Sequence, residues 1–316
     1  MAMPLVETKN LKKYFKTGAG MLHAVEDVNL KIMPGKTLGV VGESGCGKST
    51  LGRTILRLQP ATAGEVLYNG ENILKYKGKD MQKIHLNMQM VFQDPYSSLD
   101  PRMSVHNLIA EPVQVCGLLK TKAEINEHVR EIMDMCGLPA DQANLFPHEL
   151  DGGLRQRVGL ARAMAVSPKF IVCDEPVSAL DVSIQAQILN LLMDLQEQRE
   201  LSYMFITHDL CVVKHISDEI MVMYMGQVVE HAKTAELFAN PVHPYTKALL
   251  HAVPTIDLSK RNREGFMLRG EVTSPINPAP GCRFAPRCPY ATDKCKENVC
   301  LKEASPDHFV ACSLCD

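Results

Sequence analysis

The chain has 316 residues, an apolar fraction of 46% and a formal net charge of −2. This length suits one large domain with an appendage, or two domains, and the apolar fraction allows a substantial core. The near-neutral charge lacks the basic excess of typical nucleic-acid-binding proteins, so we expect no nucleic-acid partner. No apolar run reaches the roughly 18 residues of a membrane-spanning helix, and Met1–Leu11 lacks the apolar core of a secretion signal. We therefore expect a cytosolic chain that can still dock on a membrane protein.

The first 33 residues predict an antiparallel β region. Apolar and polar residues alternate in Leu5–Leu11 and in Leu22–Ile32, with turn signals around them. The apolar run Thr37–Val41 predicts a further strand. Tyr14 lies in this region, where an aromatic ring could stack on a nucleotide base or belong to the core. The residues alone leave both interpretations open.

A phosphate-binding loop follows the strand. It reads Gly42-Glu43-Ser44-Gly45-Cys46-Gly47-Lys48-Ser49-Thr50, and a helix-compatible segment follows directly. The pattern G-x-x-x-x-G-K-S between a strand and a helix is that of the P-loop. Its glycines let backbone N–H groups surround phosphate oxygens at a helix N-terminus. Lys48 would bind the β- and γ-phosphates and Ser49 would bind Mg²⁺, so the sequence predicts a nucleoside triphosphate site.

A helical insertion interrupts the α/β pattern after the P-loop. Strands are expected at residues 64–70, which end in an Asn-Gly turn, and at 88–92. From about residue 100 to 166 the pattern is helical, with a capping-box match at Thr121 and Glu124. Gly137 is a plausible helix end. The strand pattern then returns, so we expect an α/β core that carries a helical insertion.

Two acidic residues follow a strand of the returning pattern. Asp174 ends the apolar run Phe170–Asp174, and Glu175 comes next. In a chain with a P-loop, Asp174 would hold Mg²⁺ through water. Glu175 could polarise the attacking water as a general base.

These motifs and others occur in the order of an ABC transporter ATPase, which the chain resembles over residues 3–232. After the P-loop they are Gln93, Leu150–Arg157, Asp174-Glu175-Pro176, Ser178-Ala179-Leu180-Asp181 and Thr207-His208-Asp209. The resemblance implies a RecA-like core with an antiparallel β region and a helical subdomain. It also implies that two such domains sandwich ATP, the P-loop of one facing the signature loop of the other.

The resemblance assigns roles to single residues. It implies that Gln93 reaches Mg²⁺ and senses the membrane subunit, and that Tyr14 is the aromatic residue on adenine. Asp181 would be the D-loop aspartate, and His208 the switch histidine at the γ-phosphate. The expected catalytic pair is therefore Glu175 and His208. The expected Mg²⁺ ligands are Ser49, Gln93 and Asp174.

The signature loop departs from the family pattern Leu-Ser-Gly-Gly-Gln. This chain has Leu150-Asp151-Gly152-Gly153-Leu154. Asp151 can still cap the following helix, because aspartate caps as well as serine. It cannot donate the hydrogen bond that the serine gives to a γ-phosphate, and Leu154 removes a second polar contact. We expect a degenerate signature and two unequal ATP sites, unless a relaxed loop or a bound cation tolerates both changes.

Three further motifs narrow the resemblance. Tyr96–Arg102, Pro241–Leu250 and Ser274–Pro278 are similar to the dipeptide/oligopeptide (and nickel) importer ATPases, and within them to the second ATPase subunit of dipeptide permeases. This implies an ATP-hydrolysing subunit on the cytoplasmic face of a bacterial membrane. Its partners would be a second, different ATPase, two membrane permeases and a periplasmic or lipoprotein substrate-binding protein. The expected domains are residues 1–99 and 167–240 for the core, 100–166 for the helical subdomain and 241–316 for a Cys-rich extension.

Six of the eleven cysteines follow Pro280. Cys282, Cys288, Cys295 and Cys312 form a candidate four-thiolate set, with Cys300 and Cys315 as alternative fourth ligands. Soft thiolates suit Zn²⁺ or an iron–sulfur cluster, and the spacing does not decide between them. Free structural thiols are the third alternative. The resemblance favours a [4Fe–4S] cluster, which is our expectation here.

Two other classes of function compete with the importer. One is a soluble ABC ATPase that acts on ribosomes or DNA; such proteins usually carry two cassettes or a long coiled-coil insertion, and this sequence shows neither. The other is a regulatory metal-binding protein that keeps ATP as a structural ligand. An ATPase assay with and without membrane subunits separates the importer from both.

Overall fold

The computed structural model describes residues 3–253, 275–297 and 299–315. It divides into two compact units, which we describe separately. The first unit comprises Met1–Ile32, Thr37–Leu74 and Ile206–Asp316, and the second comprises Met33–Lys36 and Lys75–Phe205. Among the described residues, none of the helices is both long and apolar enough to cross a membrane.

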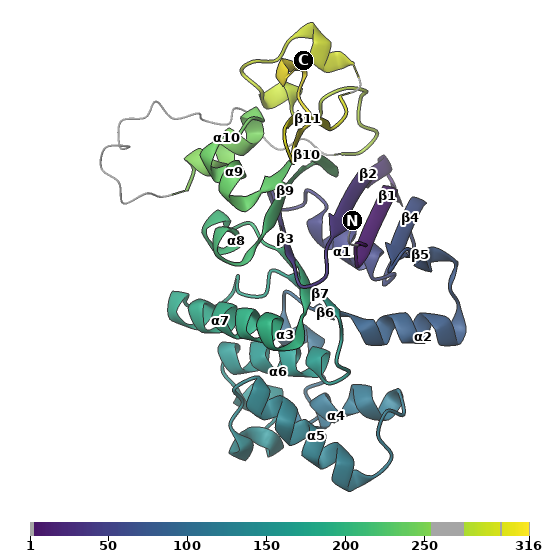
Figure 1. Ribbon diagram of the computed structural model, residues 1–316, viewed down its shortest axis with the longest axis vertical. Helices are drawn as coiled ribbons and strands as arrows, with labels where there is room; N and C mark the ends of the chain where they lie inside the picture. The colour runs from purple at the N-terminus through teal and green to yellow at the C-terminus, as the bar shows by residue number, and fades with distance from the viewer. Residues whose placement is uncertain (1–2, 254–274, 298, 316) are drawn as a thin grey trace. The chain divides into compact units, whose positions relative to one another are not determined.

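An antiparallel sheet opens the first unit (Figure 1). Its strands, in the spatial order β2-β1-β4-β5, are β2 (Gly20–Ile32), β1 (Val6–Thr17), β4 (Ala63–Tyr68) and β5 (Glu71–Asn72). Asn69 and Gly70 join β4 to β5 with φ values of 49° and 81°. Both the antiparallel β region and the Asn-Gly turn are thereby confirmed.

A second set of strands in this unit leads to the P-loop. In the order β11-β12-β10-β9-β3, they are β11 (Lys302–Ser305), β12 (His308–Val310), β10 (Gln227–Lys233), β9 (Glu219–Tyr224) and β3 (Thr37–Val41). Strand β3 is buried throughout and pairs in parallel with β9. Strand β12 pairs with β10, so the C-terminal residues extend this sheet.

Short helices complete the first unit. They are α1 (Lys48–Ile55), α8 (Leu210–Ile216), α9 (Thr234–Ala239) and α10 (Pro244–His251), with the 3₁₀ turns η1 (Ile73–Lys75), η5 (Ala285–Arg287), η6 (Asp293–Lys296) and η7 (Ser313–Cys315). Residues 275–277 run along β2, where the N–H of His23 donates to the carbonyl of Pro275 over 2.9 Å. These residues belong to the motif Ser274–Pro278 noted in the sequence, and its first residue, Ser274, lies outside the described residues.

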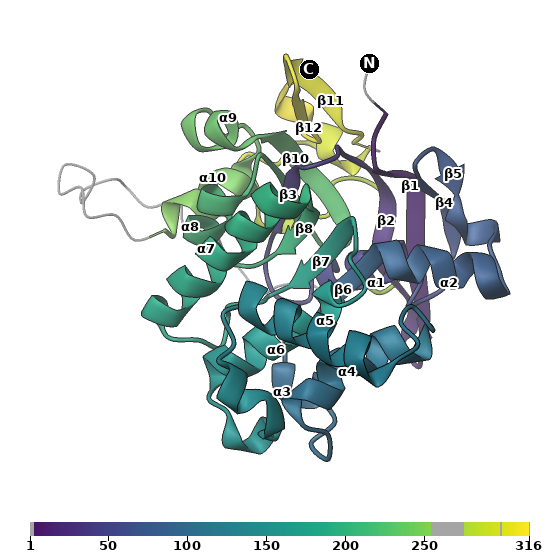
Figure 2. The ribbon, with the colours of Figure 1, turned by 60° about the horizontal axis from the view of Figure 1, so that its bottom comes forward.

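The second unit combines a small sheet with a group of helices. Its strands, in the order β8-β7-β6, are β8 (Ser202–Ile206), β7 (Phe170–Asp174) and β6 (Met88–Val91). Its helices are α2 (Gly78–Asn87), α3 (Pro95–Ser98), α4 (Val105–Val115), α5 (Lys122–Met135), α6 (Gly152–Met164) and α7 (Val182–Arg199), with η2 (Ala140–Asn144) and η3 (Pro147–Glu149). Helices α4, α5 and α6 pack on one another (Figure 2).

The capping signals in the second unit work as expected. Thr121 Oγ1 accepts from the N–H of Glu124, and Glu124 Oε2 accepts from the N–H of Thr121, over 3.2 and 3.0 Å. Gly137, with φ +62°, follows the end of α5.

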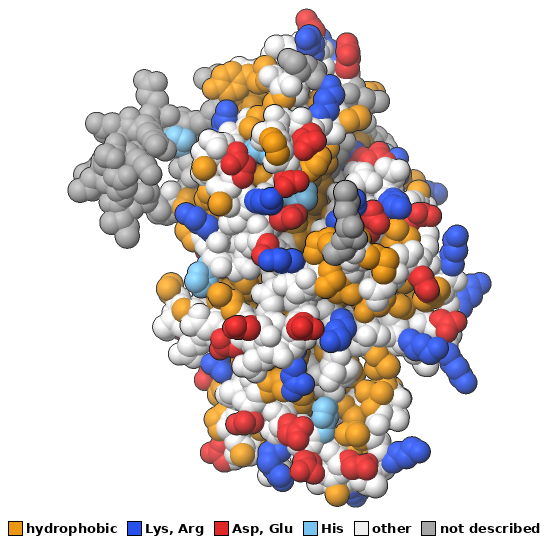
Figure 3. Space-filling model, viewed as in Figure 1, with side chains coloured by type: hydrophobic (Ala, Val, Ile, Leu, Met, Phe, Trp, Pro, Cys, Tyr) orange, Lys and Arg blue, Asp and Glu red, His pale blue; other side chains and the backbone are white. Residues whose placement is uncertain are grey.

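On the face in Figure 3, acidic and basic side chains are interspersed over α4 and α5.

Candidate functional site

The P-loop joins β3 to α1 and requires glycine at two of its positions. Gly42 has φ +152°, and a Cβ there would lie 2.2 Å from the carbonyl oxygen of Met223. Gly47 has φ +105°, and a Cβ there would lie 2.0 Å from the carbonyl oxygen of Ala24. No side chain fits at either distance, so the loop can take this path only with glycine at both positions.

The donors in this loop fit a triphosphate. Gly47 is the N-cap residue of α1, and it has no side chain that could cap the first-turn N–H groups. Such a helix N-terminus attracts phosphate through its N–H groups and its dipole. The Lys48 side chain is folded into the loop, where Nζ donates to the carbonyls of Gly42 and Glu43 over 2.8 and 3.0 Å. An ammonium group and a helix N-terminus thus meet in one glycine-rich loop.

Tyr14 lies on β1 of the same unit, and its side chain contacts His23 and Glu26. Its ring stacks on His23 with centroids 4.0 Å apart, and its hydroxyl donates to Glu26 Oε1 over 2.5 Å. Burial and the neighbouring Glu26 raise the pKa of Tyr14 to about 12, so the phenol is neutral. Burial opposes ionisation of Glu26, but hydrogen bonds from Tyr14, His23 and Lys12 lower its pKa to about 2. The half-buried ring is rigidly held, and its contact with adenine stays a prediction.

Replacing Tyr14 with alanine is expected to weaken ATP binding about threefold to tenfold, because a lost aromatic stack corresponds to about 0.5–1.5 kcal/mol. Tyr14→Phe is the matched control, since it keeps the ring and removes the bond to Glu26. Titration calorimetry with ATP would measure both variants. Equal affinity of Tyr14→Ala and the wild type would remove Tyr14 from the ATP site.

His208 follows β8 and precedes α8, and it also lies in the first unit. The residues on either side shape its backbone: Thr207 Oγ1 accepts from the N–H of Asp209, and Asp209 Oδ1 accepts from the N–H of Cys211, over 3.0 and 2.7 Å. The His208 side chain is exposed between these two anchored residues. This placement leaves the imidazole accessible to a ligand, and its role as the switch histidine stays a prediction.

The second unit brings together the expected general base, Glu175, and Gln93, the glutamine expected to reach Mg²⁺. Gln93 Nε2 donates to Glu175 Oε2 over 2.9 Å. Glu175 has φ +47°, a left-handed conformation that costs energy for a residue with a Cβ and recurs at functional sites. The preceding Asp174 is fully buried. The Gln93 amide and the Asp174 carboxylate offer the kind of oxygen ligand that Mg²⁺ prefers.

The signature residues begin α6 in this unit. Asp151 is the N-cap residue, and its Oδ1 accepts from the N–H of Leu154 over 2.8 Å. The expected capping role is therefore confirmed. A Cβ on Gly153 would lie 2.7 Å from Ile184 Cγ2, so α6 approaches α7 closely at this glycine. Asp181 is the N-cap residue of α7 but makes no side-chain cap bond, and its exposed carboxylate can serve another contact.

The expected metal cluster at the C-terminal cysteines is wrong. Cys282, Cys288, Cys295 and Cys312, as well as Cys300 and Cys315, are all described, and no group of three or more His, Cys, Asp or Glu residues in the described chain is arranged to hold a metal. This finding overturns both the [4Fe–4S] cluster and the Zn²⁺ alternative.

The environment of the thiols gives the physical reason. Cys282 and Cys288 pack against an apolar cluster that includes Phe284. Burial raises the pKa of the Cys282 thiol to about 11, which disfavours the thiolate that a metal needs at this position. At Cys295 burial is outweighed by hydrogen bonds with Ser313 and Thr292, which lower the pKa of that thiol. Cys295 Sγ is hydrogen-bonded to Ser313 Oγ at 3.2 Å. The segment is held by apolar packing and by the pairing of β12 with β10, so a metal is not needed to staple it.

The C-terminal segment, by which we mean the described residues from 241 to 315, contributes two arginines that contact residues of the predicted nucleotide site. No local pattern in the sequence indicated these contacts. Arg283 pairs with Glu26, the acceptor of the Tyr14 hydroxyl, over 3.0 Å. Arg287 pairs with Glu43 of the P-loop over 2.8 Å. Both guanidinium groups are nearly buried, with 6% and 7% exposure. The nucleotide residues of the first unit are therefore supported from the far end of the chain.

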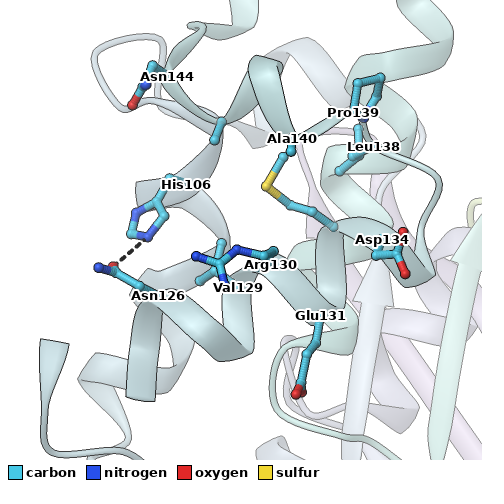
Figure 4. Close-up of a pocket in the computed structure, with 12 residues that line it drawn as sticks. His106, Asn126, Val129, Arg130, Glu131, Asp134, Leu138, Pro139, Ala140 and Asn144 are labelled. Atoms are coloured by element: carbon cyan, nitrogen blue, oxygen red, sulfur yellow. Dashed lines mark hydrogen bonds between the residues drawn. The ribbon is translucent and has the colours of Figure 1, made fainter. Parts of the chain in front are cut away.

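The helical part of the second unit contains a separate pocket (Figure 4). It has a volume of about 850 Å³ and is lined by residues of α4, α5 and the segment that follows α5. His106 Nε2 is hydrogen-bonded to Asn126 Oδ1 at 2.9 Å, and Arg130 and Asp134 add opposite charges. None of the residues expected to bind ATP lines this pocket, so the pocket is not part of the predicted ATP site.

Comparisons with known proteins agree with these motifs. The profile of the family described as ABC transporter matches residues 25–178, and that of the oligopeptide/dipeptide transporter C-terminal region matches residues 229–295. The oligopeptide transport ATP-binding protein AppF of Bacillus subtilis is 48% identical, with 98% of this chain and 97% of that protein covered. A putative peptide import ATP-binding protein of Brucella ovis is 45% identical, with 98% and 97% covered.

Solved structures extend the comparison to the fold. The ATP-binding cassette MJ0796, solved as a dimer in a post-hydrolysis state with ADP and phosphate, has a TM-score of 0.67 and 30% identity, and covers 72% of this chain and 98% of its own. The cbiO1 protein of Clostridium perfringens has the same TM-score and 26% identity, with 75% and 92% covered. The relatives carry the names of peptide-transport ATP-binding proteins, which agrees with the absence of a metal cluster among the described residues.

Proposed function

This chain belongs to the ABC transporter family of ATP-binding proteins, and from that premise we propose that it hydrolyses ATP as one of two different ATPase subunits in a peptide importer. It is a peptide-import ATP-binding subunit, an ATPase coupled to import. As in other ABC importers, such a subunit is a peripheral protein at the cytoplasmic face of the membrane. It works with membrane permeases and a substrate-binding protein.

In the proposed reaction, the loop of residues 42–50 binds the phosphates, with Lys48 on the β- and γ-phosphates. Ser49, Gln93 and Asp174 would hold Mg²⁺, which neutralises phosphate charge in such sites. Glu175 takes a proton from the attacking water, and His208 contacts the γ-phosphate. The hydrogen bond from Gln93 to Glu175 supports this assignment, because it orients the carboxylate of the base.

We further propose that the two ATP sites of the importer are unequal. The site built on this chain's P-loop would face the signature loop of the partner ATPase and hydrolyse ATP. The site that includes Asp151 would bind nucleotide and turn over slowly, because a carboxylate replaces the serine hydroxyl. The hydrogen bond that Asp151 Oδ1 accepts from the N–H of Leu154 supports this interpretation, since it holds the carboxylate at the helix N-terminus.

One observation carries the proposal: the P-loop, Asp174, Glu175 and His208 stand in family order in a chain that is 45–48% identical to peptide-import ATP-binding proteins over nearly its full length. The alternative of a regulatory metal-binding protein is no longer supported, because the described residues contain no group arranged to hold a metal. The rival reading as an ATPase on ribosomes or DNA has no support from the charge of the chain.

Affinity purification of the tagged chain from detergent-solubilised membranes is expected to recover two permeases, a second ATPase of different sequence and the substrate-binding protein. Adding that binding protein with its solute should stimulate ATP hydrolysis by the complex in proteoliposomes. Recovery of the permeases with two copies of this chain and no second ATPase would contradict the heterodimer. Recovery of ribosomes in place of permeases would contradict the importer.

A further inference from the structure

Glu43 is the acidic residue of the P-loop, and a buried arginine of the C-terminal segment holds its side chain. Arg287 donates through both terminal nitrogens, with Nη1 2.8 Å from Glu43 Oε2 and Nη2 3.1 Å from Oε1. The arginine side chain is 7% exposed and the glutamate 23% exposed. A two-pronged arginine–carboxylate pair fixes orientation as well as charge. The carboxylate is therefore set in one direction.

The backbone of Glu43 is held from the same part of the chain. Its N–H donates to Tyr245 Oη over 2.9 Å. Tyr245, on α10, is fully buried and packs edge-on against Tyr224, with ring centroids 4.7 Å apart. Phe284, three positions before Arg287, packs on both tyrosines, with centroids 5.3 and 5.4 Å apart. An aromatic cluster thus anchors both groups that hold Glu43.

These contacts bear directly on Lys48. Nζ of Lys48 donates to the carbonyl of Glu43, so the position of Glu43 sets the position of that acceptor. The free carboxylate of Glu43 would otherwise lie in a loop whose ligand is a polyanion. Like charges a few ångström apart repel, and the repulsion grows where burial lowers the effective dielectric constant. Pairing with Arg287 neutralises the carboxylate and holds it in place.

We propose that Arg287 is a positioning residue for nucleotide binding: it neutralises and orients Glu43, so that the C-terminal segment completes the P-loop. This rests on the proposed function, because the loop must bind ATP for the pair to matter. Residues 229–295, the range that matches the oligopeptide/dipeptide transporter C-terminal profile, contain both Tyr245 and Arg287. The C-terminal segment would thus contribute to ATP binding through Tyr245 and Arg287.

The test measures the affinity of the purified chain for Mg²⁺–ATP. Arg287→Ala is expected to weaken binding about threefold to tenfold, the scale of a partly buried charge pair. The double variant Glu43→Gln with Arg287→Ala should bind within about twofold of the wild type, because the repelling charge is gone. Arg287→Lys keeps the charge but loses the two-pronged geometry, and should lie between Arg287→Ala and the wild type.

Asp307→Asn is the matched control. It removes an exposed ion pair of the same C-terminal segment, to Lys233 at 2.8 Å, and should leave ATP affinity unchanged. Thermal unfolding of every variant identifies any that misfold. Wild-type affinity in Arg287→Ala, or failure of Glu43→Gln to restore binding, would overturn the proposal. Failure of the proposed function looks different, because the wild type would then bind ATP no better than a Lys48→Ala reference.

Discussion

Replacing Glu175 with glutamine is expected to lower ATP turnover by the assembled transporter about 10²- to 10⁴-fold, while ATP affinity stays within about twofold. Glutamine keeps the shape of the side chain and cannot accept the proton of the attacking water. Its amide oxygen can still accept the hydrogen bond that Gln93 donates to Glu175 over 2.9 Å. The substitution therefore removes the base and preserves its surroundings.

Phosphate release by the importer in proteoliposomes measures turnover, and filter binding of labelled ATP measures affinity. Glu197→Gln is a suitable control, because Glu197 is an exposed carboxylate on α7 of the same unit and has no role in the proposed reaction. It should leave both quantities unchanged. Near-normal turnover in Glu175→Gln would refute the assignment of the general base.

Local patterns predicted the elements that short stretches of sequence determine. The P-loop follows a buried strand and begins a helix, because G-x-x-x-x-G-K-S contains the glycines that the path requires. Thr121 and Glu124 cap α5 through their own neighbours. Asp151 caps α6 in the same way, three residues from its donor. In both caps the interacting groups lie within one turn of the chain.

Helix α2 was not predicted, because its sequence lacks the apolar stripe that marks a packed helix. Ile84 is its one buried residue, and most of the other side chains of α2 are polar. Helical periodicity needs several apolar positions on one face to be visible. Contacts with neighbouring segments determine such an element more than its own composition does.

The cysteine cluster failed as a prediction for a related reason. The sequence indicated four thiols that follow Pro280, but coordination depends on where the side chains point. The structure directs Cys282 and Cys288 towards apolar residues. The pair formed by Glu43 and Arg287 could not be predicted either, because the two residues are 244 positions apart in the sequence. Long-range contacts leave no periodic trace in one sequence.

The altered signature loop gives the second large expected effect. A homodimer of this chain would place Asp151 in both ATP sites, so the chain purified alone should be a poor ATPase. Changing Asp151 to serine and Leu154 to glutamine together should raise its turnover about tenfold or more, because 1.4 kcal/mol corresponds to tenfold. A lost hydrogen bond to a charged group amounts to about 1.5–3 kcal/mol, and removal of like-charge repulsion adds to the gain.

The structure makes this double change a clean test. Asp151 caps α6 by accepting from the N–H of Leu154 over 2.8 Å, and serine caps a helix about as well as aspartate, so the fold should tolerate the change. Steady-state phosphate release at saturating Mg²⁺–ATP measures the effect in the isolated chain. Adding Glu175→Gln to the double variant should abolish the gain, which assigns the new turnover to this chain's own base. Vigorous activity of the unmodified chain, unaffected by the double change, would show that Asp151 and Leu154 serve as well as the family residues.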